Sequence, residues 1–403
     1  MPMIARKWAA AGVALGLMAA SPAFAGPECQ NGQDFPRWLD GVRREAAAAG
    51  ISQATIQAAL GPVQFDPGIV KRDRGQGVFQ QTFLQFAGRM VSADRMSRGG
   101  ALLKSQAALL GRIEQKFGVP APVLVAFWGL ETDFGSDKGK YPIFTSLATL
   151  AYDCRRPDFF RPELIDALRI VEKGDLTPGQ MVGDWAGEAG HMMMTPTDYD
   201  RSGVDFDGDG RRDVINSVPD ALASGASLLV HFGWKRGEPW LQEVRVPADL
   251  PWDQADLAIR HPRAQWARWG VAAAHGSLPA DGQPASLLLP MGRNGPAFLA
   301  YPNFQAFLGW NKAFVYATTA AYYATRLSGA PPVSPGNGPV TPLTTEQVRE
   351  LQGLLVRRGF SREQPDGRIG NATRSAVKQA QMRYGLPADS YPTADLIERL
   401  RGG

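Results

Sequence analysis

The residue with the clearest chemical potential in this sequence is Glu131, a carboxylate at the end of an apolar run. Seven of the eight residues from Val123 to Leu130 are apolar. Pro122 suits the first turn of a helix and Gly135 suits its end, so the run predicts a helix that carries Glu131 in its last turn.

Leu124, Phe127 and Trp128 precede Glu131 by seven, four and three residues and therefore share its helix face. Beside such packing a carboxyl group resists ionisation, its pKa rises, and it can donate a proton near neutral pH. The alternative is a structural Glu at a helix end that pairs with an Arg.

A second candidate is the stretch Asp205 to Asp213, which resembles the start of a calcium-binding loop. Asp205, Asp207 and Asp209 stand at loop positions one, three and five, with Gly210 at position six. Arg211 stands at position seven, where such loops use a backbone carbonyl. Position twelve holds Asn216 instead of Glu, so Asp220 is the candidate for the last ligand. The alternative is an Asp- and Gly-rich surface turn without a metal.

A third stretch, residues 183–190, is rich in Gly and Ala, which suggests close backbone approach beside a cleft. The histidines, at positions 191, 231, 261 and 275, lack the spacing of a zinc site. Cys29 and Cys154 are the two cysteines, and in an exported chain we expect one disulfide between them; two free buried thiols are the alternative.

Residues 1–25 read as a secretory signal, with Arg6 and Lys7, a short apolar core and small residues before a cleavage site near Ala25. We therefore expect an exported, periplasmic protein without a membrane span. The formal net charge of +4 is modest for 403 residues, which makes nucleic acid a poor candidate partner but suits an anionic polymer.

Periodicity predicts a mainly α chain. We expect helices between residues 35 and 60, over 102–117, 144–152, 162–172 and 217–234, and one final helix over 304–327. An aromatic stripe at positions 79, 83, 86 and 90 is expected in the core. Residues 243–302 read as a small β-containing subdomain. A Pro/Gly linker over 329–342 then leads to about 60 residues that read as short amphipathic helices.

Several segments, taken in order, resemble the exported lytic murein transglycosylases of the membrane-bound lytic transglycosylase B type. The resemblance covers roughly residues 33–327, and it is carried by residues 127–136, 147–153, Arg155-Arg156, 159–160, 185–187, the Asp205 loop, 220–224, 233–234 and 303–304. Residues 343–403 resemble the small peptidoglycan-binding domain of bacterial wall hydrolases, through Leu351-Gln352, Leu355, Gly359-Phe360, Asp366-Gly367, Gly370, Thr373, Ala376-Val377 and Gln381.

The resemblance implies a fold that is mainly α (α+β). It comprises a lysozyme-like catalytic domain over 26–328 with a small β-containing subdomain and an EF-hand-like loop, followed by a three-helix domain over 343–403. It implies cleavage of the β-1,4 bond between N-acetylmuramic acid (MurNAc) and N-acetylglucosamine (GlcNAc), with formation of 1,6-anhydro ends and Glu131 as acid and then base. No catalytic cofactor is implied, only a structural Ca²⁺. The partner is peptidoglycan, and other cell-wall enzymes are candidates.

Arg155 and Arg156 match family residues near the peptide stem, where guanidinium groups can pair with carboxylates; a solvated surface pair is the alternative. Several expected substrate contacts are altered. Asp184 stands where the family has Ser, and Met193-Met194 stand where it has Gln-Phe. Trp310-Asn311-Lys312-Ala313 replace Tyr-Asn-x-Ser.

Met cannot make the hydrogen bonds of Gln, and Ala cannot replace a hydroxyl. A carboxylate at position 184 near Glu131 would raise its pKa further and could activate water. We therefore expect transglycosylation that is retained but weakened, with muramidase-like hydrolysis assisted by Asp184 or a wall-binding scaffold as alternatives.

Overall fold

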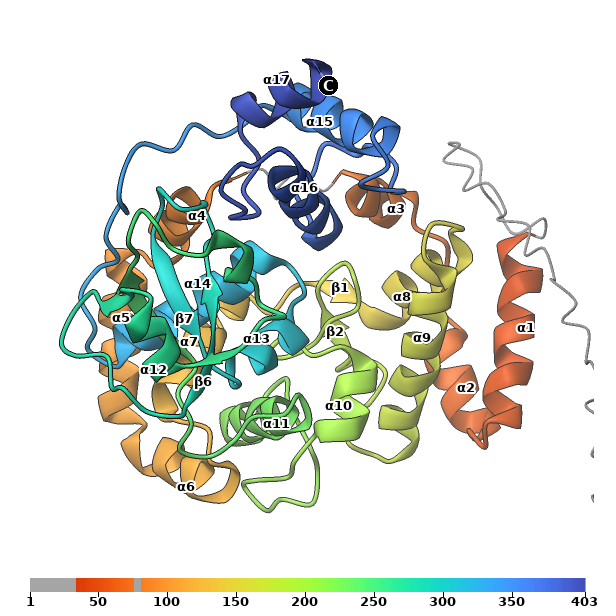
Figure 1. Cartoon of the computed structure of the whole chain (residues 1–403). Helices are drawn as coiled ribbons and strands as arrows, with labels where there is room; N and C mark the ends of the chain where they lie inside the picture. The colour runs from red at the N-terminus through yellow and green to blue at the C-terminus, as the bar shows by residue number, and fades with distance from the viewer. Residues whose placement is uncertain (1–33, 76–80, 403) are drawn as a thin grey trace, which may run out of the picture.

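The computed structural model describes residues 34–75 and 81–402 and is mainly helical (Figure 1). No helix in these two ranges is long and apolar enough to cross a membrane. The predicted signal at 1–25 lies outside the described residues, as do Cys29 and Phe79.

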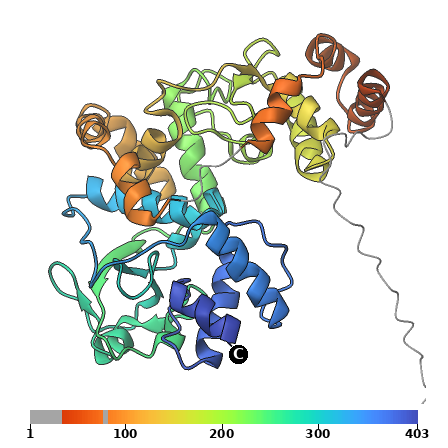
Figure 2. The ribbon, with the colours of Figure 1, turned by 90° about the horizontal axis from the view of Figure 1, so that it is seen from above.

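The first helices are set by side-chain caps that the sequence supplies. They are α1 (Phe35–Ala48), α2 (Gln53–Leu60), α3 (Pro67–Arg74) and α4 (Phe83–Met90). Asp34 and Ser52 accept hydrogen bonds from the first turns of α1 and α2, and Thr82 forms a reciprocal capping box at α4. The predicted break between α1 and α2 is confirmed. These two helices lie at one edge of the molecule, away from the C-terminal end (Figure 2).

The prediction of one helix over 102–117 is wrong. Helix α5 (Ala93–Ser105) begins nine residues earlier, because Ser92 Oγ accepts a hydrogen bond from the Arg95 backbone N–H. It ends at Gln106, whose backbone leaves the helical region, and α6 (Ala107–Phe117) follows.

Helix α7 (Ala121–Thr132) is the centre of the larger core and is buried on nearly every side. Helix α14 (Phe314–Leu327) packs across it at Gly129. A Cβ at Gly129 would lie 2.9 Å from the Phe134 ring and 3.1 Å from the Tyr323 ring, so only glycine allows this approach. α8 (Ile143–Tyr152) and α9 (Pro157–Glu172) form an adjacent pair, and α9 begins five residues before the predicted start.

The expected β-containing subdomain is confirmed. An antiparallel sheet has the order β4-β6-β7-β3-β5, with bounds β3 (Leu241–Arg245), β4 (His261–Pro262), β5 (Ala272–Ala273), β6 (Pro284–Leu288) and β7 (Ala297–Ala300). It has a core of its own around Trp266, Leu287 and Leu299. Further elements of the chain are β1 (Tyr141–Pro142), β2 (Val182–Gly183), α10 (Pro196–Ser202), α11 (Val218–His231), the 3-10 turn η2 (Trp252–Gln254) and α12 (Arg263–Arg268).

The prediction of one final helix over 304–327 is also wrong. The chain forms α13 (Phe304–Trp310) and then turns at residues 311–313 before α14 begins. Asn311 leaves the helical conformation, and its Oδ1 accepts a hydrogen bond from the Ala313 N–H at 2.9 Å. This turn brings both helix ends to Glu131.

The C-terminal segment forms the expected three helices, α15 (Thr345–Arg357), α16 (Asn371–Arg383) and α17 (Ala394–Gly402), around a separate small core. This unit packs directly on the rest of the chain (Figure 2). The segment before it, 329–342, also lies against the larger part, since the Asn337 N–H donates to the Asn294 carbonyl at 2.8 Å.

Candidate active site

Glu131 lies in the last turn of α7, and the end of that helix is held firmly. Asp133 closes the helix in the left-handed conformation, with φ of 51°. Arg95 Nε lies 3.2 Å from Asp133 Oδ1, and Arg98 Nη1 lies 2.8 Å from Asp133 Oδ2. These ion pairs fix the turn that follows Glu131.

A second set of contacts ties α7 to the glycine-rich loop. Trp128 Nε1 donates to His191 Nδ1 at 3.1 Å, and Thr132 Oγ1 donates to the His191 carbonyl at 2.7 Å. Burial lowers the pKa of His191 to about 4, so the ring is neutral at pH 7 and Nδ1 is free to accept. His191 is therefore a structural link between the helix and the loop.

The two helices on either side of the 311–313 turn both contact one oxygen of Glu131. Trp310 Nε1, at the end of α13, donates to Glu131 Oε1 at 2.8 Å, and the Tyr316 hydroxyl of α14 donates to the same atom. Glu131 Oε2 accepts no hydrogen bond from the part of the chain that the structure describes. The Trp310 ring stacks on Phe127, with centroids 4.4 Å apart.

This environment raises the pKa of Glu131 to about 7. Burial is the main cause, the hydrogen bonds from Tyr316 and Trp310 act against it, and the charge of Asp184 raises the pKa further. A carboxyl with this pKa can give and take a proton near neutral pH, as its apolar setting predicted.

Glu131 opens into a pocket of about 500 Å³. Opposite Glu131 the pocket is lined by the glycine-rich loop and by the segment after α7. The lining side chains are Asp137, Lys140, Tyr141, Asp184, Trp185, Glu188 and Met193. β1 pairs with β2 in the register Tyr141↔Gly183, which brings these two segments together. The pairing needs Gly139, since a Cβ there would lie 2.0 Å from the Gly183 carbonyl oxygen.

Asp184 lies in this wall but also holds the loop in shape. Its Oδ1 accepts hydrogen bonds from the N–H groups of Ala186 at 2.8 Å and Glu188 at 2.9 Å. Burial raises its pKa. The structure thus brings Asp184 and Glu131 to one pocket, as the resemblance implied.

Sequence reasoning missed Glu188 and Tyr316. Burial raises the pKa of Glu188 well above its usual range, and the nearby charges of Asp184 and Glu131 add to the effect. Tyr316 follows the turn that the single-helix prediction overlooked. Glu188 was visible as the lone charged residue among the small residues of the stretch 186–190, whereas Tyr316 had no local signal.

The other predicted substrate-binding residues lie at different places. Met193 lines the pocket in a left-handed conformation with φ of 43°. Trp310 points its indole N–H at Glu131, and Asn311 closes the turn beside it. Arg155 and Arg156 both pair with Asp73 of α3, which is 1% exposed, and do not line this pocket.

In the acidic loop, ligand atoms of Asp205, Asp207 and Asp209 lie within 4.8 Å of one another. Three carboxylates at this spacing fit a hard cation such as Ca²⁺. Asp220 is not part of this group: its Oδ1 accepts from the Phe206 and Asp207 N–H groups and its Oδ2 from that of Asp213. Asn216 Nδ2 donates a hydrogen bond to Asp213 Oδ2, and the Arg211 backbone N–H donates one to Asp209 Oδ1.

The predicted disulfide involves Cys29, which lies outside the described residues, so the pairing stays a prediction. Cys154 follows α8, and no free cysteine occurs among the described residues.

Residues 34–325 match the family described as the Transglycosylase SLT domain. The chain belongs to this family. Residues 344–400 match the Putative peptidoglycan binding domain. The resemblance drawn from the sequence is confirmed, and the SLT-domain family is one of enzymes that cleave glycosidic bonds.

Among curated proteins, this SLT-domain chain is 28% identical over 239 residues to the membrane-bound lytic murein transglycosylase B of Escherichia coli K12. The match covers 58% of this chain and 64% of that protein, so it spans less than two thirds of the relative.

Among solved structures, SltB3 of Pseudomonas aeruginosa in complex with NAG-anhNAM-pentapeptide matches with a TM-score of 0.85 and 40% identity, covering 92% of this chain and 100% of that one. E. coli Slt35 in complex with calcium matches with a TM-score of 0.62 and 25% identity, covering 74% of this chain and 96% of that one. The lysozyme-like, mainly α fold expected from the sequence is confirmed.

Proposed function

We propose that this protein cleaves the β-1,4 bond between MurNAc and GlcNAc in peptidoglycan and leaves 1,6-anhydro-MurNAc ends. The observation that carries the proposal is the asymmetry of Glu131: both hydrogen-bond donors contact Oε1, which leaves Oε2 for the substrate. One carboxyl with a pKa of about 7 then serves as acid and base in turn.

In the first step Glu131 Oε2 donates its proton to the glycosidic oxygen, the bond to the muramyl C1 breaks, and GlcNAc leaves with the oxygen. The carboxylate that forms is stabilised by the hydrogen bonds from Tyr316 and Trp310. In the second step it takes the proton of the muramyl 6-hydroxyl while O6 bonds to C1. Water is not consumed, and an intramolecular nucleophile replaces a second carboxylate.

Hydrolysis is the second candidate because Asp184 lines the same pocket. Its Oδ1 is occupied by two backbone N–H groups, so only Oδ2 is available to activate water. A wall-binding scaffold with weakened catalysis is the third, and it rests on the cleft replacements (Asp184, Met193, Trp310 and Ala313) and on the C-terminal peptidoglycan-binding match.

The domain proposal divides the chain into a signal at 1–25, a catalytic domain at 26–328, a linker at 329–342 and a peptidoglycan-binding domain at 343–403. Export to the periplasm and a structural Ca²⁺ held by Asp205, Asp207 and Asp209 belong to the same proposal. Arg155 and Arg156 would pair with stem-peptide carboxylates, but both already pair with Asp73 and neither lines the Glu131 pocket.

The test is digestion of purified wall sacculi followed by mass analysis of the released sugar ends. Transglycosylation predicts anhydro ends, which are lighter than reducing ends by one water. Reducing ends alone would favour hydrolysis, and binding without release would favour the scaffold.

A further inference from the structure

The C-terminal domain is fixed to the catalytic part by contacts from α16 and from the segment that follows it. Lys378 Nζ lies 3.1 Å from Asp256 Oδ2 and donates to the Ala255 carbonyl at 3.2 Å. Asp389 Oδ2 accepts a hydrogen bond from the Arg293 N–H at 3.0 Å. The domain is therefore packed directly against the catalytic part of the chain.

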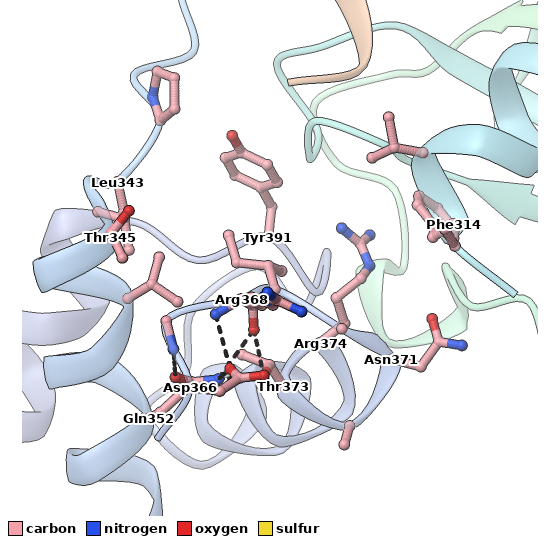
Figure 3. Close-up of a pocket in the computed structure, with 18 of the residues that line it drawn as sticks. Phe314, Leu343, Thr345, Gln352, Asp366, Arg368, Asn371, Thr373, Arg374 and Tyr391 are labelled. Atoms are coloured by element: carbon pink, nitrogen blue, oxygen red, sulfur yellow. Dashed lines mark hydrogen bonds between the residues drawn. The ribbon is translucent and has the colours of Figure 1, made fainter. Parts of the chain in front are cut away.

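Arg374, near the start of α16, contacts one of the two helices that hold the donors to Glu131. Its Nη2 donates to the Leu289 carbonyl at 2.8 Å, just after β6. Its guanidinium carbon lies 4.7 Å from the ring centroid of Phe314 (Figure 3). A planar guanidinium stacked on a ring forms a directional contact. Arg374 thus joins α16, the sheet and α14.

Phe314 is the first residue of α14, and no side-chain cap holds this helix end. Tyr316 is two residues further on, and Trp310 is on the other side of the short 311–313 turn. Both donate to Glu131 Oε1. Phe314 therefore lies within four residues of both donors along the chain.

We propose that Arg374 is a positioning residue for the catalytic acid: by stacking on Phe314 it holds the first turn of α14, so that Tyr316 and Trp310 keep their hydrogen bonds to Glu131. This inference rests on the proposed role of Glu131 and adds that the C-terminal domain tunes the acid itself. A pocket of about 390 Å³ between the domains is lined by Lys312, Phe314 and Arg374, so a wall segment bound there would touch this link (Figure 3).

The pH profile of activity reports the pKa of Glu131, and that pKa depends on the groups that face Glu131. Tyr316 and Trp310 face it from α14 and α13, Asp184 and Glu188 from the loop, and Asp137, Lys140 and Tyr141 from the segment after α7. The first two lower its pKa. Burial lowers the pKa of Arg374, and the nearby Asp389, Tyr391 and Asp256 act against that shift.

The experiment compares Arg374→Ala with Lys378→Ala in the full-length protein. Lys378 is on the same helix and also contacts the catalytic part, but it does not contact Phe314. Each variant is assayed on sacculi and on a soluble glycan of two disaccharide units.

For Arg374→Ala we expect kcat on the short glycan to fall about tenfold, as small misplacements at a site do. The basic limb of the pH profile should move to higher pH, because the loosened donors no longer lower the pKa of Glu131. Lys378→Ala should leave both unchanged. Arg374→Lys, which keeps the charge but loses the planar stack, should behave like Arg374→Ala and serves if the alanine variant does not fold.

The inference is overturned if Arg374→Ala only raises KM for sacculi and leaves kcat and the pH profile on the short glycan unaltered. It is also overturned if Lys378→Ala gives the same change, since domain docking in general would then be the cause. Failure of the proposed function is distinguishable: it would appear as full activity of Glu131→Gln, whatever Arg374 does.

Discussion

The two walls around Glu131 act on it in opposite directions. The α13–α14 wall offers two hydrogen-bond donors, Trp310 and Tyr316, which stabilise the carboxylate and lower its pKa. The loop wall offers Asp184, whose charge raises that pKa, and Glu188 beside it. Burial raises the pKa of Glu131, and the opposing effects of the two walls adjust it to about 7. Each wall can be altered separately by mutation.

The largest effect is expected from the donor wall. Tyr316→Phe removes a hydrogen bond to Glu131 Oε1, which stabilises the carboxylate formed as the proton leaves, so kcat should fall about a hundredfold. The basic limb of the pH profile should move to higher pH, because a group that lowers the pKa is gone. Trp310→Phe, which keeps a ring against Phe127, should give a smaller change in the same direction. An unchanged basic limb in both variants would contradict the claim that these two donors lower the pKa of Glu131.

The loop wall should give the opposite shift. Asp184→Asn removes the charge but keeps an oxygen that accepts the Ala186 and Glu188 N–H groups. The pKa of Glu131 should fall, and the basic limb of kcat/KM should move to lower pH with a several-fold loss near pH 7. A limb that moves upward would show that Asp184 does not act on Glu131 through its charge.

The burial of Glu131, which outweighs the donor wall, should destabilise the folded protein at alkaline pH. The pKa of Glu131 rises from 4.5 to about 7 on folding, so the folded state binds more protons within that window. The free energy of unfolding must then fall as pH rises through the window, and Glu131→Gln should abolish that part of the dependence. Thermal unfolding should show the variant more stable than the wild type at pH 8 and nearly equal at pH 4; an equal difference at both values would contradict the assignment.

The smallest effect is expected away from both walls, at the Asp205–Asp209 cluster. If it holds Ca²⁺, millimolar Ca²⁺ should raise Tm by about 1 to 4 °C over the chelated protein, through preferential binding to the folded state. Asp207→Asn should remove the shift, while catalysis on soluble glycan stays as before. Equal Tm values with Ca²⁺ and chelator would identify the cluster as a turn without metal.

The two walls and the acid between them also differ in how well the sequence predicts them. Glu131 was predictable because its signal is local: an apolar helix face that ends in a carboxylate. The small sheet and the three C-terminal helices followed from composition and period.

Tyr316 was not predictable in this way, since its role depends on the turn at Asn311, and the apolar run on both sides of that turn reads as one helix. The Asp73 partner of Arg155 and Arg156 is separated from them by more than 80 residues, and only the packing of α3 brings them together. Such long-range contacts leave no periodic trace in the sequence.

The central claim is that Glu131 alone serves as both acid and base. Its most direct test is to digest sacculi with the wild type and with Glu131→Gln and to measure the masses of the released muropeptides. The account predicts anhydro ends from the wild type and a loss of at least a thousandfold, to near background, in the variant, because the acid and the base are the same group. Release of anhydro ends by Glu131→Gln at the wild-type rate would contradict it.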